Sequence, residues 1–339
     1  MTPKHLTKVV GLVLALSLVA SVSLWALAQE VDYTREEYDA YSECTNLTDP
    51  AAKQKCVLKF IEAHPKLSLV EYGIAEYGRA LQEQIQAGQH EKVVTAGEAM
   101  LKYRPDQINL ITQLCYSAYN SGQYEKAAKY GELAYSKTNS QDFIQILSDA
   151  YKKSGNQQKY KVWALKAIND LEPSQSFAFV EEFRSNAARR EDWRQAARYA
   201  RKTLDSLSKM EPNPNISQSE WNKWLRSQKA ISYLLLGRNA YEGQSWASAV
   251  VHYQRVIRHS RDRNLRGESH YYIGMSNWKE NRLQPAMEAF ACGSGQKGSP
   301  HAGASDAYLT RLYRSTHNDS TAGLDEFKVR AKRSCGRSS

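Results

Sequence analysis

The stretch Tyr119–Tyr135, YNSGQYEKAAKYGELAY, has the spacing of two helices joined by a tight turn. Gly122 interrupts one helix-like run, and Tyr124, Ala127 and Ala134 lie at helical intervals in the next. Small residues such as Ala127 allow two helices to pack closely, and a large residue such as Tyr124 fills the space between them. The stretch therefore predicts a helical hairpin that turns at Gly122.

Similar hairpins precede and follow this one at a nearly constant period. The interval from Gly88 to Gly122 is almost the same as the interval from Gly122 to Gly155. The three segments end near similar positions: Pro105, Asn139 and Pro173. Further copies have small and large residues at equivalent places: Gly237, Trp246, Ala249 and Tyr253; Gly274, Leu283, Ala286 and Phe290; and, less clearly, Trp193, Ala196 and Ala200. A fixed period of this kind is typical of a repeat protein.

The pattern resembles the tetratricopeptide repeat, a helical hairpin whose period matches these intervals and which has small residues at fixed places. The resemblance covers roughly residues 33–335 and is strongest over 74–175 and 230–293. The first hairpin resembles the N-terminal repeats of exported bacterial members of this family. The resemblance implies an all-α fold, an α-solenoid of stacked antiparallel helical hairpins in a right-handed superhelix, with roughly seven or eight hairpins.

The repeat pattern also divides the chain into segments. After residues 1–28, we expect a divergent N-terminal helical hairpin (29–73), followed by regular repeats (74–209) and a proline-containing linker (210–217). The next segment (218–293) contains a long helix from about Gln218 to Tyr241 and further repeats. The last segment (294–339) is a glycine-rich loop followed by a C-terminal capping hairpin and a basic tail. The linker and the loop are each either a hinge or a tolerated surface insertion.

Residues 1–28 have the features of a secretory signal peptide. Lys4 and Lys8 give a basic start, Val9–Trp25 is an uncharged apolar run, and Ala26–Ala28 offers a small-x-small cleavage site. The apolar run is close to the length that spans a bilayer, so an uncleaved anchor formed by residues 9–25 is the alternative. We expect an exported protein, periplasmic or extracellular, or else one anchored to the inner membrane.

The sequence shows no pattern that is typical of an enzyme. It contains no GxSxG, Walker or HExxH motif, and its histidines are not spaced as zinc ligands. We therefore expect no catalytic residues, no metal and no cofactor. The formal net charge of +10 is spread along the chain except for the basic end Lys328–Arg337. For an exported protein we expect a protein or peptide partner and no nucleic acid, with membrane contact only through an uncleaved N-terminal segment.

The five cysteines are candidates for disulfides in an oxidising compartment. Cys44 and Cys56 fall on the two predicted helices of the first hairpin, where a disulfide would hold a terminal repeat together. Cys292 and Cys335 could join the last regular repeat to the C-terminal hairpin. Cys115 occupies a small-residue position of its repeat, which predicts a buried thiol.

The tetratricopeptide resemblance implies that the first helix of each hairpin faces a concave groove. The outward-facing positions of these helices are Asn109, Tyr116, Tyr119, Asn120, Lys152, Arg189, Arg238, Tyr241, Tyr271 and Trp278. This mixture of Tyr, Trp, Asn, Arg and Lys is typical of binding interfaces. The alternative for any single aromatic residue is that it packs against the next hairpin.

We therefore expect a non-enzymatic protein–protein interaction scaffold in the cell envelope that holds a partner segment in the concave groove. The alternative is a glycan-binding or peptidoglycan-binding envelope protein whose Tyr and Trp rings stack on sugars. Aromatic faces with few basic neighbours would favour the sugar, whereas Arg or Lys beside Asn would favour the peptide.

Overall fold

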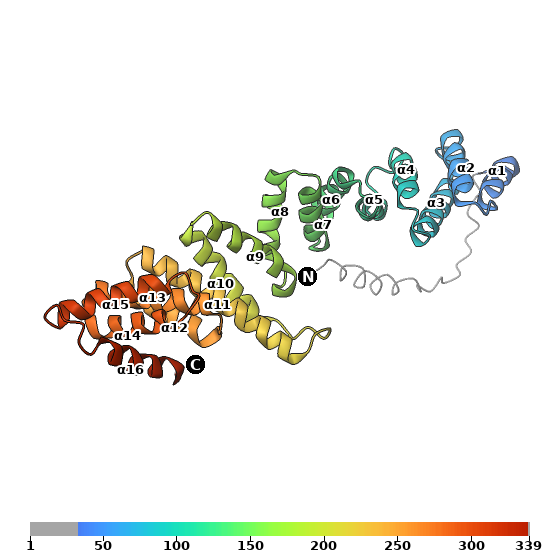
Figure 1. Cartoon of the computed structure of the whole chain (residues 1–339). Helices are drawn as coiled ribbons and strands as arrows, with labels where there is room; N and C mark the ends of the chain where they lie inside the picture. The colour runs from blue at the N-terminus through green and yellow to red at the C-terminus, as the bar shows by residue number, and fades with distance from the viewer. Residues whose placement is uncertain (1–32, 338–339) are drawn as a thin grey trace. The chain divides into compact units, whose positions relative to one another are not determined.

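The chain is helical throughout the residues that the structure describes, 33–337 (Figure 1). This computed structural model contains sixteen α-helices and no strand in that range. Within each compact unit, neighbouring helices pack against one another in the order of the sequence, which is the architecture of an α-solenoid. The all-α solenoid fold is thereby confirmed. The predicted signal peptide or anchor lies outside the described residues.

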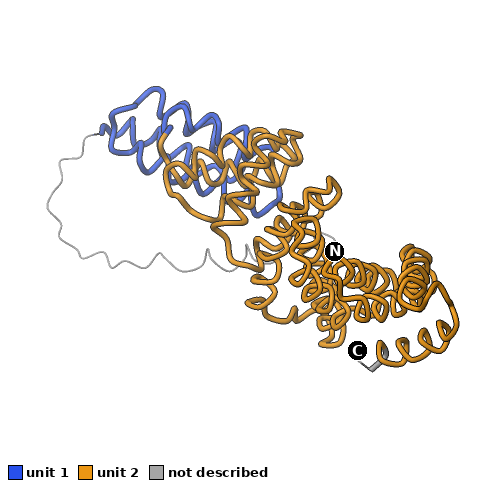
Figure 2. The backbone as a smooth tube through the Cα atoms, turned by 90° about the vertical axis from the view of Figure 1, so that its left-hand side faces the viewer, with its two compact units in different colours: residues 1–105 blue, residues 106–339 orange. Residues whose placement is uncertain are grey.

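The chain divides after Pro105 into two compact units, which Figure 2 colours separately. The first unit contains α1 (Arg35–Thr45), α2 (Pro50–Ala63), α3 (Leu69–Gln86) and α4 (His90–Leu101). Thr34 and Glu37 form a reciprocal capping box that starts α1, and the Asp49 carboxylate accepts the backbone N–H of Ala52 at the start of α2. The segment boundary expected between residues 73 and 74 falls inside α3, because that helix already begins at Leu69.

The second unit contains six helical hairpins in its described part. Their first helices are α5 (Ile108–Asn120), α7 (Asp142–Lys153), α9 (Pro173–Arg189), α11 (Gln218–Glu242), α13 (Arg263–Lys279) and α15 (Ala302–Thr316). Their second helices are α6 (Tyr124–Thr138), α8 (Gln157–Asp170), α10 (Trp193–Lys209), α12 (Trp246–His259), α14 (Leu283–Ser294) and α16 (Leu324–Arg337). Residues 210–217 form the expected non-helical linker, and the expected long helix α11 follows it.

In three hairpins, the turn between the two helices contains a glycine whose backbone adopts the left-handed conformation. Gly88, Gly122 and Gly155 have φ angles of 69°, 78° and 79°, a conformation that costs glycine little because it has no Cβ atom. After Gly122, the N–H of Gln123 donates to the carbonyl of Ala118 at 2.8 Å, which is the long hydrogen bond of a Schellman turn. The prediction of turns at these glycines is confirmed.

The same turn recurs at three residues that are not glycine. Glu191, Gln244 and Asn281 have φ angles of 56°, 57° and 55°. Each lies two residues before a second helix, as Gly88, Gly122 and Gly155 do. The sequence pattern missed these turns because no glycine marks them.

Two hairpins bring their helices together at a glycine that faces an aromatic ring of the second helix. A Cβ atom added to Gly274 of α13 would lie 2.6 Å from the ring of Phe290 in α14, and one added to Gly237 of α11 would lie 2.9 Å from the ring of Tyr253 in α12. Both rings are fully buried. The prediction that Gly237 and Gly274 mark close helix approaches is confirmed.

Arg184 of α9 stands at the position that Gly237 and Gly274 occupy, as its spacing from the buried Ala200 of α10 shows. Its guanidinium donates to Ser232 Oγ at 3.0 Å and to Gln228 Oε1 at 2.9 Å, both on α11. The side chain is buried, with 2% of its surface exposed. Arg184 therefore joins α9 to α11 across the linker.

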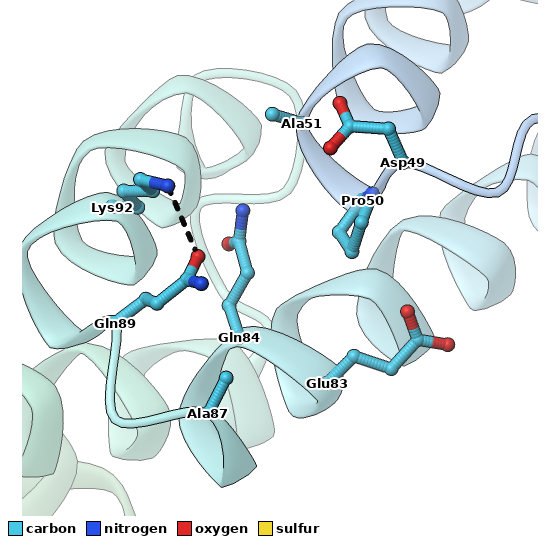
Figure 3. A pocket seen from close by; sticks show the side chains of 8 residues that line it. All are labelled: Asp49, Pro50, Ala51, Glu83, Gln84, Ala87, Gln89 and Lys92. Atoms are coloured by element: carbon cyan, nitrogen blue, oxygen red, sulfur yellow. Dashed lines mark hydrogen bonds between the residues drawn. The ribbon is translucent and has the colours of Figure 1, made fainter.

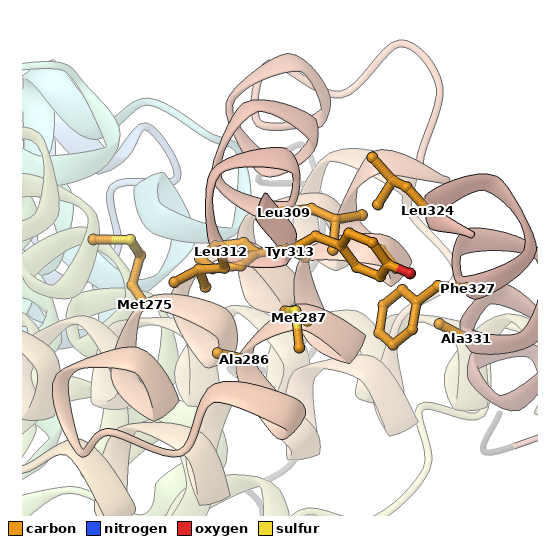
Figure 4. Close-up of a cluster of buried hydrophobic side chains, with 11 residues drawn as sticks. Met275, Ala286, Met287, Leu309, Leu312, Tyr313, Leu324, Phe327 and Ala331 are labelled. Atoms are coloured by element: carbon orange, nitrogen blue, oxygen red, sulfur yellow. The ribbon is translucent and has the colours of Figure 1, made fainter. Parts of the chain in front are cut away.

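The last hairpin packs on α14 through a cluster of apolar side chains (Figure 4). Leu309, Leu312 and Tyr313 of α15 meet Leu324 and Phe327 of α16 in this cluster. The loop before α15 is shorter than the predicted glycine-rich segment, since α14 extends to Ser294. Part of the loop is packed, because Ser299 is buried and its side chain occupies the space that a Cβ atom of Gly267 would need.

Four of the five cysteines are joined in pairs. Cys44 is bonded to Cys56 with their Cα atoms 5.2 Å apart, and Cys292 to Cys335 with their Cα atoms 5.9 Å apart. The first disulfide links α1 to α2, and the second links α14 to α16. Cys115 is a free, fully buried cysteine, and burial raises the pKa of its thiol to about 12.

Candidate binding surface

Tyr119 of α5 meets two charged side chains of α7. Its hydroxyl donates to the Asp149 carboxylate, and the Lys153 ammonium donates to that hydroxyl at 2.9 Å. Lys153 also lies 2.6 Å from Asp149 and 4.7 Å from the centre of the Tyr119 ring. Burial opposes the charge on Lys153, but its hydrogen bonds to Asp149 and Tyr119 raise its pKa above the ordinary value. Lys153 is therefore a permanent cation at physiological pH.

The next first helices are linked by an ion pair. Lys152 of α7 lies 2.5 Å from the Glu182 carboxylate of α9, and both side chains are partly exposed. The Lys152 ammonium also lies 5.2 Å from the centre of the Tyr160 ring. On α5, the half-buried Tyr116 packs against Phe143 of α7, and burial raises its pKa to about 12.

Arg238 of α11 lies between two aromatic rings. Its guanidinium carbon is 4.3 Å from the centre of the Tyr272 ring and 4.9 Å from that of the Trp193 ring. Its Nε atom is 3.6 Å from the Glu268 carboxylate on α13. The side chain is 21% exposed, so part of the guanidinium edge still reaches solvent.

A cluster of half-buried aromatic side chains continues from α11 to α15. Tyr241 lies 4.8 Å from Tyr272, Tyr271 lies 5.9 Å from Tyr308, and Trp278 lies 5.5 Å from Tyr308, measured between ring centres. The Arg311 guanidinium lies 5.7 Å from the centre of the Trp278 ring. Burial raises the pKa of Tyr241 and of Tyr271.

The ten predicted residues thus fall into two groups. Seven contact side chains of other helices: Tyr116, Tyr119, Lys152, Arg238, Tyr241, Tyr271 and Trp278. For the five aromatic residues among them, this is the packing alternative. Three are exposed and form no side-chain hydrogen bond, ion pair or ring contact with the described part of the chain: Asn109, Asn120 and Arg189. The structure brings the first group together along successive first helices and leaves the second group available to a ligand.

Sequence reasoning missed most partners in these contacts, although a regular spacing marks them. Four pairs join neighbouring first helices and share one sequence separation: Tyr119 with Asp149, Lys152 with Glu182, Arg238 with Glu268, and Trp278 with Tyr308. This separation is about one helical turn shorter than the repeat period. A search for side chains at this separation on predicted first helices would have found Glu182, Glu268 and Tyr308.

Other parts of the described chain offer less for a ligand. A cavity of about 120 Å³ in the first unit is lined by Asp49, Pro50, Ala51, Glu83, Gln84, Ala87, Gln89 and Lys92 (Figure 3). Most of its polar side chains already bond to protein, since Lys92 donates to Gln89 at 3.2 Å and Gln54 donates to Gln84 at 3.0 Å. Within residues 33–337, no group of three His, Cys, Asp or Glu residues is arranged to hold a metal ion. Nor does any helix in that range have the length and apolar content needed to cross a bilayer.

No protein-family model matches the sequence, and no curated protein is significantly similar to it. The likeness to tetratricopeptide repeats therefore rests on the sequence period and on the recurring turns and helix contacts described above.

Proposed function

We propose that the protein is a non-enzymatic scaffold of the cell envelope with tetratricopeptide-like repeats. In this proposal, the first helices α5 to α15 bind an extended or helical segment of a partner protein. The main support is the chemistry of that row of helices. On α5, the exposed Asn109 and Asn120 lie on the same helix as the half-buried Tyr116 and Tyr119. The exposed Arg189 lies on α9, and further half-buried Tyr and Trp rings lie on α11 and α13.

The exposed polar side chains and the half-buried aromatic rings have different parts in the proposed binding. Asn109 and Asn120 would exchange hydrogen bonds with the backbone of the partner, because a side-chain amide both donates and accepts. Arg189 would pair with a carboxylate of the partner. The half-buried rings of Tyr241, Tyr271 and Trp278 would supply apolar contact, and their packing holds them in place before the partner arrives.

The contacts of the aromatic rings favour a peptide over a sugar. Arg238 lies over the rings of Trp193 and Tyr272, and Arg311 lies over that of Trp278. Each of these three rings therefore has a guanidinium group over one of its faces, where a sugar would otherwise stack. Aromatic side chains with basic neighbours match the sugar alternative less well than the peptide alternative.

A peptide-selection experiment tests this proposal. Peptides are selected from a random display library against the protein, and their affinities are measured for the wild type and for an Asn120→Ala/Arg189→Ala variant. Both side chains are exposed and make no contact that the fold depends on, so the variant should fold normally. We expect an affinity loss of roughly five- to thirtyfold, the usual effect of removing one or two interface side chains.

The matched control is Gln158→Ala/Arg198→Ala, which removes exposed side chains of similar chemistry from the second helices α8 and α10. It should bind the selected peptides as the wild type does. Equal affinity of all three proteins would place the binding surface elsewhere. Failure to select any peptide, together with binding of soluble peptidoglycan fragments, would support the glycan alternative.

A further inference from the structure

The positive charge of the chain is concentrated in three consecutive helices. Residues 193–259, from the start of α10 to the end of α12, contain eleven Lys or Arg and four Asp or Glu. Their net charge is +7, compared with +10 for the whole chain. The expectation that charge is spread along the chain is therefore wrong for this segment.

Five of these cations lie together and form what we call the basic face: Arg201 of α10, Arg226 and Lys229 of α11, and Arg255 and Arg258 of α12. The four arginines are exposed, and Lys229 is half-buried. In the described chain, no carboxylate forms an ion pair with any of the five.

Aromatic side chains form the centre of the basic face. The ring of His259 stacks on that of Tyr233 with 5.6 Å between their centres and an angle of 8° between their planes. The His252 ring lies on Tyr233 at 6.4 Å, and the Arg255 guanidinium is 5.1 Å from the centre of the Tyr233 ring. These contacts hold α11 and α12 together beneath the cations.

Burial and the cations of the basic face both lower the pKa values of His252 and His259. Burial lowers the pKa of His259, and Lys229 and Arg226 of α11 and Arg255 and Arg258 of α12 lower it further. Burial likewise lowers the pKa of His252, with added repulsion from Arg255 and from Arg201 of α10. The charges that shift the pKa of either imidazole are all positive, so the surroundings of both rings favour an anion.

We propose that the basic face is a docking surface for the anionic phospholipid headgroups of a membrane. Four of its five cations are arginine, whose planar fork suits phosphate oxygens. Its residues line neither of the two cavities found at residues 49–92 and at residues 307–319. Exposed cations on three adjacent helices suit the many phosphate groups of a membrane surface. Each cation adds to the attraction between the protein and that surface. The sequence analysis expected membrane contact only through an uncleaved N-terminal segment, and this proposal adds a second membrane contact that does not depend on that segment.

Vesicle co-sedimentation of the full chain tests the proposal. Vesicles of phosphatidylcholine are compared with vesicles that also contain roughly 30 mol% phosphatidylglycerol, at low and at physiological salt. Phosphatidylcholine alone measures any attachment through the N-terminal apolar run. We expect the anionic lipid to increase binding, and Arg226→Glu/Arg258→Glu to weaken that increase roughly tenfold or more. Both arginines are exposed, and circular dichroism verifies that the variant is folded.

The matched control is Arg330→Glu/Arg333→Glu in the basic C-terminal tail, which changes the net charge by the same amount. It should bind as the wild type does. Equal losses in both variants would show attraction by net charge alone and overturn the proposal. Tight binding of polyglutamate without any binding to phosphatidylglycerol would also overturn the proposal. In that case the basic face would bind an acidic polypeptide. Inorganic phosphate that prevents sedimentation at low millimolar concentration would mean a discrete phosphate site instead.

A pH series gives a second readout. Because nearby phosphates favour protonation of His252 and His259, lipid binding should tighten as the pH falls from about 7 to about 5. His252→Gln/His259→Gln should bind anionic vesicles with a flatter pH dependence. An unchanged pH dependence in this variant would show that the headgroups do not approach the imidazoles, against the proposed docking surface.

Discussion

A Gly274→Ala substitution tests the close helix approach on which the repeat packing depends. The added Cβ atom would lie 2.6, 2.7 and 2.8 Å from three ring atoms of Phe290. The ring is fully buried, stacks on Tyr308 at 5.5 Å and contacts Tyr271 at 6.1 Å, so it has little room to move. Adding a methyl group to a packed site costs about 1–3 kcal/mol of stability. Three contacts below 3.0 Å with a ring that has little room to move place this site in the upper part of that range, at about 2–3 kcal/mol. Alanine regains about 1 kcal/mol of helix propensity in α13.

The net expectation is a loss of about 1–2 kcal/mol in the free energy of unfolding. For a unit of this size, that corresponds to a fall of roughly 2–8 °C in the melting temperature. Urea denaturation followed by circular dichroism in the far ultraviolet measures the effect, with the denaturant slope as a check on two-state behaviour.

Two further variants isolate the contact with the ring. Gly78→Ala is the first, because nothing lies within 4 Å of a Cβ atom at that helical position, and it should be neutral or stabilising. The second is Phe290→Leu, which should lessen the cost of Gly274→Ala when the two are combined, since the smaller side chain leaves room for the methyl group. A Gly274→Ala protein as stable as the wild type would refute the proposed helix separation.

Two other predictions concern buried polar side chains in the second unit. Arg184→Ala should destabilise this unit by about 2–4 kcal/mol in urea denaturation, because Ser232 and Gln228 lose a charged hydrogen-bond partner in a buried site; a loss below about 0.5 kcal/mol would contradict a structural role. Burial lowers the pKa of His270 to about 4, below its ordinary value of about 6.5, so the unfolded chain binds the proton more readily. The stability that His270 contributes is therefore complete above about pH 6.5 and is lost as the pH falls toward about 4. The His270→Gln variant should lack this part of the pH dependence when the melting temperature is measured across that range.

Much of the fold could be predicted from local features of the sequence. Gly88, Gly122 and Gly155 mark turns because glycine adopts positive φ at low cost, and their spacing gives the repeat period. The prolines of residues 210–217 mark the linker before α11, since proline lacks the backbone N–H that a helix interior requires. The turns at Glu191, Gln244 and Asn281 could not be recognised in this way, because none of these residues is a glycine, although their backbone is left-handed.

The candidate binding surface was predictable only in part. Helical periodicity correctly identified which side chains lie on the first helices, but it could not say which of them would meet a partner within the chain. Arg238 lies between Trp193 and Tyr272, which come from two other helices. By contrast, Asn120 remains exposed.

The sequence by itself determined that this protein is a stack of helical hairpins, because turn residues and helical periodicity act over a few residues. Only the tertiary structure decided which polar side chains are paired within the chain and which stay exposed without such a pair. It placed Asp149 on Tyr119 and Glu182 on Lys152, and it gathered Arg201, Arg226 and Arg258 without a carboxylate among them. The physical reason is that electrostatic pairing depends on distances of a few ångströms between residues that lie far apart in the chain, on helices of different hairpins.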